Sequence, residues 1–497
     1  MGQLSLFPDI KEKQTDLAYE SFSHDRVCPE SARTMIERRY NHLLKETDEF
    51  SRRTVSFQAN KTNVLHSWMK YREGFSADLV ETLIRKFRIG PGATILDPFA
   101  GSCTTLLVAM MSGIAAVGVE LLPHCHLAWE AKKRAFGYSL DELRHIRSII
   151  ENTSPPPTDE RFPHISITES AFPEDTERAI MAYTRWGKTL NLSDDARVLW
   201  QLILLSILEE VSYTRKDGQY LRWDTRARKI QDRNEKRVAN NQVPFRGIDK
   251  GQLRGVKEAL LHALNKIISD VAELQREPPQ PSSLELIKGN TLYTLPTLEP
   301  GRFAGVITSP PYANRYDYTR TYALELAYLG VGEEIFRLRQ SQLSCTVENR
   351  SKQSELEGFY QSLGAYDRFT GIMDVVEHNA ALSEVTAALH ERNRRGEINN
   401  AGVLPMVTQY FTELAFIFAE LFRVCASDAR VAFVNDNVRY AGEIIPVDML
   451  STNLAEQVGF TPEAIYVLTQ RKGNSSQQME KFGRVALRKS ITVWRKN

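Results

Sequence analysis

Two consecutive prolines, Pro310 and Pro311, lie just beyond the apolar run 303–307. An apolar run of this length predicts a buried parallel strand. Because proline cannot donate to a sheet ladder or continue a helix interior, the chain must leave the strand there in a fixed, extended turn. Open α/β sheets place ligands at such strand ends. The Ser309 hydroxyl, the free carbonyls and the Tyr312 ring suit a flat ligand with an amino group; the alternative is a strand exit with a packed tyrosine.

A second strand end with a polar loop occurs earlier in the chain. Residues 93–97 form an apolar run ending in an aspartate, a loop of small residues follows, and residues 106–111 predict a helix. The run 115–120 predicts the next strand and ends in Glu120, 19 residues after Gly101. Strand, loop, helix, strand and acid in this order form one half of a dinucleotide-type sheet. We therefore expect an α/β, Rossmann-like fold with a mostly parallel twisted sheet and large helical insertions.

The groups at this second strand end suit a ligand that carries both an amino acid and a nucleoside. The loop lacks the Gly-Lys-Ser/Thr of a phosphate-binding P-loop and the GxGxxG of an NAD site. Asp97 can receive an ammonium, the turn amides can meet a carboxylate, and Phe99 can pack on the apolar part of the ligand. Glu120 can accept both ribose hydroxyls. S-adenosyl-L-methionine has this set of groups, although Asp97 could instead cap the helix and Glu120 could be an exposed strand end.

Composition excludes several classes of protein. The net charge is +1, so nucleic-acid binding requires a local basic patch. The five cysteines are scattered and form no CxxC pair, which argues against a disulfide framework or a zinc ribbon and favours a reducing cytoplasm. No apolar run approaches the ~18 residues of a membrane span, and residues 1–10 lack a signal-peptide pattern. We expect a soluble, cytoplasmic protein without a metal site.

Two long segments interrupt the predicted sheet. The first, 151–283, contains a basic stretch at 213–257 with 13 Lys or Arg against 5 Asp or Glu and interleaved aromatic residues. We expect this stretch to contact DNA phosphates, with a solvated helical hairpin as the alternative. The second segment, 333–404, is mildly acidic, has weak helical periodicity from 375 to 389, and is the alternative recognition element.

These segments divide the chain into six parts. We expect an N-terminal helical extension at 1–60, the sheet domain in three parts at 61–150, 284–332 and 405–497, and the two insertions between those parts. In the extension, residues 31–44 predict a solvated amphipathic helix with Arg33, Arg38 and Arg39 on one broad side.

Two motifs resemble those of one enzyme family. Residues 97–105, Asp-Pro-Phe-Ala-Gly-Ser-Cys-Thr-Thr, resemble the cofactor-binding motif of the amino-methylating DNA methyltransferases, which implies a class I methyltransferase fold. Ser309-Pro310-Pro311-Tyr312 resembles their catalytic motif in the form typical of the N4-cytosine group. Residues 66–80 resemble the segment that touches the methionine end of the cofactor, and residues 286–290 resemble the motif near its adenine. The candidate cofactor-binding residues are His66, Ser76, Asp97, Phe99, Gly101, Ser102, Thr104, Thr105, Glu120 and Asn290.

Three features depart from the usual pattern of that family. Cys103 stands where glycine is usual, so the turn must avoid positive φ there or tolerate strain. Asn290 stands where an aspartate is common. The first insertion separates the two motifs by an unusually long segment, and the cofactor motif precedes the catalytic motif, which differs from many proteins with this style of loop.

The resemblance implies methyl transfer from S-adenosyl-L-methionine to the N4 amine of cytosine in double-stranded DNA, as in a restriction-modification enzyme with a possible cognate endonuclease. Ser309 Oγ and the Pro310 carbonyl would accept hydrogen bonds from the amine, and Tyr312 would stack on a base rotated out of the duplex. The candidate DNA contacts are Arg222, Arg226, Arg228, Lys229, Arg315 and Arg320.

Other functions remain open on the sequence. The alternatives are N6-adenine methylation of DNA, methylation of an exocyclic amine in RNA, and an inactive methyltransferase-like DNA-binding protein. A nicotinamide-dependent dehydrogenase is disfavoured by the missing GxGxxG. We expect no membrane partner.

Overall fold

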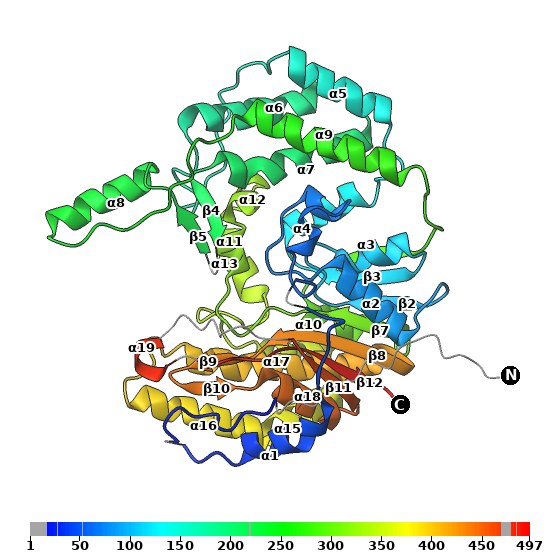
Figure 1. The fold of residues 1–497 in the computed structure, drawn as a ribbon, viewed down its shortest axis with the longest axis vertical. Helices are drawn as coiled ribbons and strands as arrows, with labels where there is room; N and C mark the ends of the chain where they lie inside the picture. Colours follow the sequence, from blue (N-terminus) through cyan, green and yellow to red (C-terminus); the bar gives the residue numbers. More distant parts are fainter. Residues whose placement is uncertain (1–16, 27, 52, 218–219, 469–478, 484) are drawn as a thin grey trace.

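The protein is built on one eight-stranded sheet, seen in a computed structural model that describes residues 17–26, 28–51, 53–217, 220–468, 479–483 and 485–497 (Figure 1). In order across the sheet the strands are β1 (Leu44–Glu46), β11 (Thr461–Val467), β12 (Lys489–Arg495), β8 (Cys425–Asp436), β7 (Phe303–Thr308), β2 (Thr94–Asp97), β3 (Ala115–Glu120) and β6 (Leu284–Lys288).

The sheet is mostly parallel, as predicted. Strand β12 runs antiparallel to both of its neighbours, and every other pair in the sheet is parallel. On one side of the sheet the strand order β2, β3, β6 follows the chain away from the centre, and on the other side the order β7, β8 does the same. The border between β2 and β7 is therefore a topological switch point, where open α/β sheets bind ligands.

Both faces of the central part of the sheet are covered, which explains why strands such as β2, β3 and β7 are almost entirely apolar. Successive side chains of a strand point to opposite faces. Ile95 and Ile307 accordingly belong to one hydrophobic core, and their neighbours Leu96 and Val306 belong to the other. The first core is closed by α2 (Ala77–Phe87), α3 (Thr104–Met111) and α4 (Pro123–Lys132), and the second by α17 (Val403–Val424) and α18 (Val447–Gln457).

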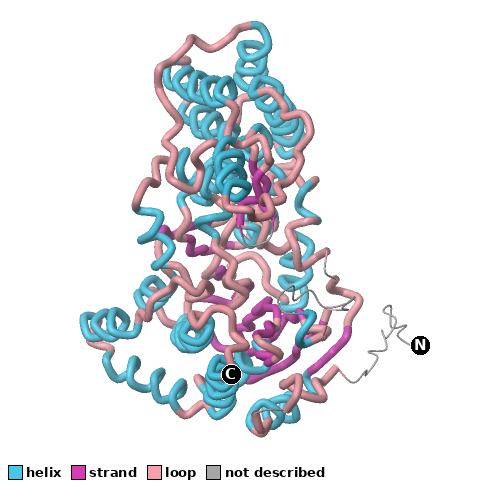
Figure 2. Tube along the Cα trace, turned by 90° about the vertical axis from the view of Figure 1, so that its left-hand side faces the viewer, coloured by secondary structure: helices cyan, strands magenta, loops and turns pink. Residues whose placement is uncertain are grey.

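The first insertion forms a helical layer at one end of the long axis of the molecule, beyond the sheet (Figures 1 and 2). Its helices are α5 (Leu140–Asn152), α6 (Glu174–Thr189), α7 (Asp194–Val211) and α9 (Val256–Leu274). The basic stretch within it is an antiparallel hairpin of β4 (Thr214–Asp217) and β5 (Tyr220–Trp223), followed by α8 (Arg228–Ala239), which extends away from the body of the protein (Figure 1). The helical-hairpin alternative is therefore wrong.

The second insertion covers the sheet face that α17 closes. It contains α13 (Glu334–Ser341), α14 (Gln353–Ser362), α15 (Tyr366–Glu377) and α16 (Ala380–Arg394), and α15 and α16 pack against α17. The single periodic segment expected at 375–389 is divided between α15 and α16. Asn379 causes the break, because its side chain accepts a hydrogen bond from the Leu382 amide and caps α16.

The N-terminal segment is bound into this half of the molecule. Its strand β1 pairs with β11, and its helix α1 (Ala32–Tyr40) lies beside α16 and α18. Arg33 is fully buried and forms ion pairs with Glu384 at 2.6 Å and Glu443 at 3.1 Å. The expectation of a solvated Arg33 was wrong, because two carboxylates far along the chain neutralise the guanidinium in the interior.

The remaining short elements connect these layers. They are α10 (Thr291–Thr294), α11 (Tyr318–Thr321), α12 (Ala323–Tyr328), the β9–β10 hairpin (Val438–Tyr440 and Glu443–Ile445) and α19 (Met479–Phe482). Among the described helices, none combines the length and the apolar composition that crossing a membrane requires.

Candidate active site

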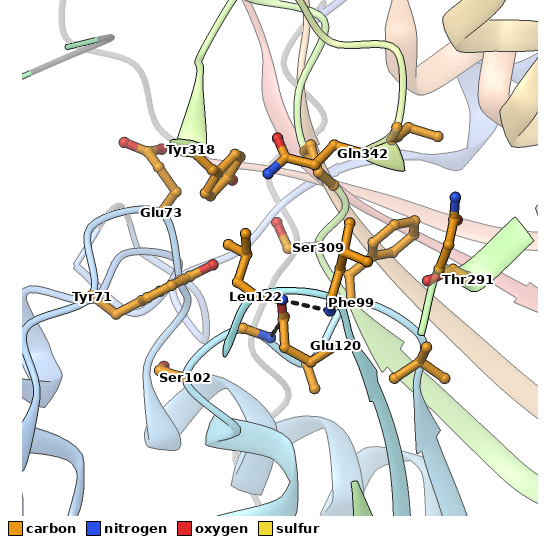
Figure 3. A pocket seen from close by; sticks show the side chains of 18 of the residues that line it. Tyr71, Glu73, Phe99, Ser102, Glu120, Leu122, Thr291, Ser309, Tyr318 and Gln342 are labelled. Atoms are coloured by element: carbon orange, nitrogen blue, oxygen red, sulfur yellow. Dashed lines mark hydrogen bonds between the residues drawn. The ribbon is translucent and has the colours of Figure 1, made fainter. Parts of the chain in front are cut away.

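A cavity of about 720 Å³ opens where β2, β3, β6 and β7 end (Figure 3). Its walls come from the loops after those four strands, from the segment before α2, and from side chains near α11 and α13. The predicted site residues that line it are Phe99, Gly101, Ser102, Thr104, Glu120, Asn290, Ser309 and Pro311. The sheet thus brings the two sequence motifs to one cavity.

The loop after β2 turns through two residues with positive φ, Gly101 at 51° and Cys103 at 64°. A side chain at Gly101 would come within 3.1 Å of the Tyr71 hydroxyl, so the close approach of Tyr71 and the positive φ both favour glycine there. Cys103 adopts the left-handed conformation despite its side chain, which is fully buried. The turn therefore tolerates strain at the position where glycine is usual.

Asp97 joins the two motifs instead of facing the cavity. Its carboxylate accepts hydrogen bonds from Thr105 Oγ1 at 2.7 Å, Thr308 Oγ1 at 2.9 Å and the Phe99 amide at 3.1 Å. Burial raises the pKa of Asp97 to about 6. Neither Asp97 nor Thr105 lines the cavity. These hydrogen bonds connect the β2 loop to the end of β7.

Glu120 is a buried carboxylate on the cavity wall, so the exposed strand end considered for it is wrong. It accepts hydrogen bonds from the amides of Gly101 at 2.7 Å, Leu121 at 2.8 Å and Leu122 at 2.7 Å, and part of this set is drawn in Figure 3. Burial raises the pKa of Glu120 to about 7, although the three amides favour its charged form. The arrangement fixes a carboxyl group with two oriented oxygens on the lining of the cavity.

Asn290 lines the cavity and precedes Thr291, which lies at the opposite end of the cavity from Tyr71 (Figure 3). Its side chain accepts from the Leu292 amide at 3.0 Å, which caps α10, and donates to the Ser341 carbonyl at 2.7 Å. Both ends of the Asn290 amide are therefore engaged by the protein. The hydroxyl of Thr291 donates to the Pro98 carbonyl and ties α10 to the β2 loop.

The segment before α2 reaches the cavity through residues that the sequence analysis did not choose. Ser76 caps α2 by accepting from the Leu79 amide at 3.3 Å, and His66 is buried with its pKa lowered to about 3 by that burial. Neither lines the cavity. Tyr71 and Glu73, which lie between them, do so (Figure 3), and burial raises the pKa of Glu73. The segment was identified from the sequence, but its facing residues depend on a non-helical conformation that periodicity does not predict.

The proline turn after β7 carries the Ser309 hydroxyl into the middle of the cavity (Figure 3). Ser309 Oγ donates a hydrogen bond to the Tyr312 hydroxyl at 3.0 Å. Pro310 is buried and Tyr312 half-buried. Beyond the turn, Tyr440 donates to the Ala313 carbonyl at 2.6 Å and braces the backbone. A serine oxygen is thereby held at the cavity wall, with its proton directed toward the phenol.

Two residues facing the turn were missed by the sequence analysis. Tyr318 of α11 and Gln342 after α13 line the cavity across from Ser309 (Figure 3). The Gln342 amide makes no hydrogen bond within the protein through either of its side-chain atoms, which are buried. No motif marks these residues: Tyr318 lies beyond the proline turn in the part at 284–332, and Gln342 lies in the second insertion at 333–404.

The candidate DNA contacts fall into two groups that meet at a second hollow. This hollow of about 610 Å³ is lined by Lys229 at the start of α8, Trp223 of β5 and Arg320 of α11. The Lys229 ammonium lies 4.4 Å from the centre of the Trp223 ring. Arg320 is held by Asp317 at 3.3 Å and Glu348 at 3.1 Å.

The other candidate cations lie outside this hollow. Arg222 and Arg228 have exposed side chains, and Arg315 is half-buried just beyond the proline turn with φ of 67°. Arg226 is bound by Asp224, with nitrogen–oxygen distances of 2.9 and 2.8 Å. Among the residues that the structure describes, no group of three or more His, Cys, Asp or Glu side chains could hold a metal ion.

Comparison with known proteins agrees with this geometry. A family model described as DNA methylase, of the N6/N4 methyltransferase type, matches residues 16–130. The chain is 53% identical over 491 residues to the type II methyltransferase M.BsoBI of Geobacillus stearothermophilus, covering 98% of this chain and 96% of that protein. It is 38% identical over 500 residues to the type II methyltransferase M.AvaI of Nostoc sp., covering 98% of each protein.

Proposed function

The chain belongs to the type II DNA methyltransferases of the N4/N6 amino-methylating group, and on that premise we propose that it transfers a methyl group from S-adenosyl-L-methionine to the N4 amine of cytosine in double-stranded DNA. The observation that carries the proposal is the position of Ser309. Its hydroxyl lies on the wall of the cavity whose floor holds Glu120.

The residues around the cavity fit the proposed cofactor. Glu120, oriented by three backbone amides, would accept the ribose hydroxyls. Phe99, Asn290 and Thr291 would surround the adenine at one end of the cavity. Glu73 is the carboxylate available at the other end for the methionine ammonium, because Glu73 lines the cavity and Asp97 does not.

The chemistry requires activation of a weak nucleophile. The cytosine amine delocalises its lone pair into the ring, and acceptors outside the ring plane would favour a pyramidal nitrogen that attacks. Ser309 Oγ and the Pro310 carbonyl are the proposed acceptors, and Tyr312 is the proposed stacking partner of the flipped base. When bound, the cofactor supplies a methyl group on a sulfonium, so the protein contributes mainly by positioning the amine.

The first test of this site is removal of its functional groups. Ser309→Ala and Tyr312→Ala should each reduce transfer of a tritiated methyl group to DNA by at least roughly 100-fold, the scale of one positioned catalytic group, while cofactor affinity stays unchanged. Ser362→Ala and Tyr366→Ala, on helices of the second insertion, are the matched controls. Wild-type rates in Ser309→Ala and Tyr312→Ala would refute the site.

DNA would approach the end of the protein that carries the hairpin and α8. We propose that Arg222, Arg226, Arg228 and Lys229, with Arg315 and Arg320, contact its backbone. Support comes from the basic charge of this stretch and from the hollow that Lys229 and Arg320 share.

The proposed DNA contact is tested by neutralising cations at the start of α8 and in the segment that precedes it. The slope of log affinity against log salt concentration is negative. Replacing Arg226, Arg228 and Lys229 by Gln should make this slope shallower by about 0.9 for each phosphate that is left without its cation. The control is Arg394→Gln with Arg395→Gln, two exposed arginines near the end of α16. An unchanged affinity and salt slope in the triple variant would exclude this surface.

The names of the relatives also support a place in a restriction-modification system. We propose that a cognate endonuclease cuts the sequence that this protein methylates. Plasmid DNA from a host expressing the protein should then resist such an endonuclease, and plasmid from a host expressing Ser309→Ala should be cut.

A further inference from the structure

Lys489 lies beside the proposed catalytic turn although it is far from it in the sequence. It is the first residue of β12, which runs antiparallel to β8. The carboxyl ends of β7 and β8 lie at the same end of the sheet as the start of β12. Lys489 therefore lies at the end of the sheet that carries the turn after β7. It pairs across the strands with Asp436, the last residue of β8, and its Nζ is 3.1 Å from Asp436 Oδ1.

The Lys489 ammonium occupies one face of the Tyr312 ring. The nitrogen lies 5.0 Å from the centre of the ring, a distance at which a cation is attracted to an aromatic face. Burial lowers the pKa of Lys489, but Tyr312 and Asp436 outweigh it and leave that pKa above its ordinary value. Since a base cannot stack on a face that Lys489 already covers, only the opposite face is available to it.

Tyr312 in turn controls the proton of Ser309. The Ser309 hydroxyl donates to the phenol oxygen at 3.0 Å. A hydroxyl whose proton is committed in this way presents its lone pairs to other donors. For Ser309 to accept from an amine, its own proton must point elsewhere, and the phenol oxygen is where it points. A rotation of the Tyr312 ring would release that proton.

We propose that Lys489, held by Asp436, is a positioning residue for methyl transfer. It fixes the Tyr312 ring so that the phenol oxygen keeps the Ser309 proton and the free ring face meets the flipped base. This inference rests on the function proposed above. It extends the catalytic unit to two residues on β8 and β12 that do not line the cavity.

The test distinguishes a role of Lys489 in positioning Tyr312 from a role only in stabilising the fold at this end of the sheet. Lys489→Met removes the charge and keeps the length of the side chain, and Lys489→Arg keeps the charge. The control is Lys496→Met, because Lys496 follows β12 at its other end and lies 4.8 Å from the centre of the Phe422 ring. Turnover is measured with tritiated S-adenosyl-L-methionine and an unmethylated plasmid, and cofactor affinity by calorimetry.

Lys489→Met should lower kcat at least tenfold with the cofactor Kd within twofold of wild type. Lys489→Arg should recover most of the loss, and Lys496→Met should match the wild type. In Tyr312→Ala, which lacks both the phenol oxygen and the ring, adding Lys489→Met should lower kcat by less than threefold further. If Lys489→Met does not fold, Asp436→Asn replaces it, with the same expected fall in kcat.

Two results would overturn the inference in different ways. The first result is an active wild type and a Lys489→Met variant whose kcat is within twofold of the wild-type kcat; where Asp436→Asn replaces that variant, the same limit applies to it. This result refutes the role of Lys489 and leaves the proposed function standing. A wild type that binds S-adenosyl-L-methionine but methylates no plasmid refutes both.

Discussion

Glu120→Gln tests the proposed cofactor site with a minimal change of shape. In the wild type the carboxylate accepts three backbone amides at 2.7–2.8 Å and is held at the cavity floor. A hydrogen bond to a charged group contributes about 1.5–3 kcal/mol, and a neutral one about 0.5–1.5 kcal/mol. Losing the charge on two ribose contacts therefore costs about 2–3 kcal/mol, or roughly 30–150-fold in Kd.

Calorimetry with S-adenosyl-L-methionine at two pH values is the assay. Because burial raises the pKa of Glu120 to about 7, acid protonates the group that must accept the ribose. Affinity of the wild type should fall about tenfold per pH unit below that pKa, and Glu120→Gln should lose this dependence. Glu285→Gln, on the exposed side of β6, is the control. A Kd for Glu120→Gln within threefold of the wild type, with the pH dependence retained, would refute the assignment.

Three further predictions concern stability. Burial raises the pKa of Asp97 to about 6 and that of Glu120 to about 7. The contribution of these two groups to the free energy of unfolding is therefore present at low pH and lost as pH rises through these values. From roughly pH 4 to roughly pH 7 the free energy of unfolding of the apo wild type should fall relative to that of the double variant Asp97→Asn with Glu120→Gln. Cys103→Gly should be about 1 kcal/mol more stable than Cys103→Ala in urea denaturation, reversing the usual order, because φ is 64° at this position. Lys216→Met should cost about 3–5 kcal/mol by leaving the buried Glu325 carboxylate unpaired, and adding Glu325→Leu should recover most of the loss.

The sheet could be predicted from the sequence because its strands are buried on both faces. Runs such as 115–119 and 303–307 have no polar side chain within the run, and few other structures bury every residue of so short a segment. The proline turn could also be predicted from local sequence, because two consecutive prolines exclude both a helix interior and a hydrogen-bonded strand regardless of the rest of the chain.

The inward orientation of Asp97 could not be predicted. A carboxylate at a strand end can face a ligand or a neighbouring turn, and the decision here depends on Thr308, 211 residues away in the sequence. The same reason hides Lys489, whose partner Asp436 is set by strand register.

The central claim is methyl transfer to cytosine N4 at the Ser309 turn, and the most direct measurement is mass spectrometry of nucleosides from treated DNA. Unmethylated plasmid incubated with the protein and S-adenosyl-L-methionine should yield N4-methyl-2′-deoxycytidine, and Ser309→Ala should abolish it. N6-methyl-2′-deoxyadenosine in its place, or no methylated nucleoside at all, would contradict the account.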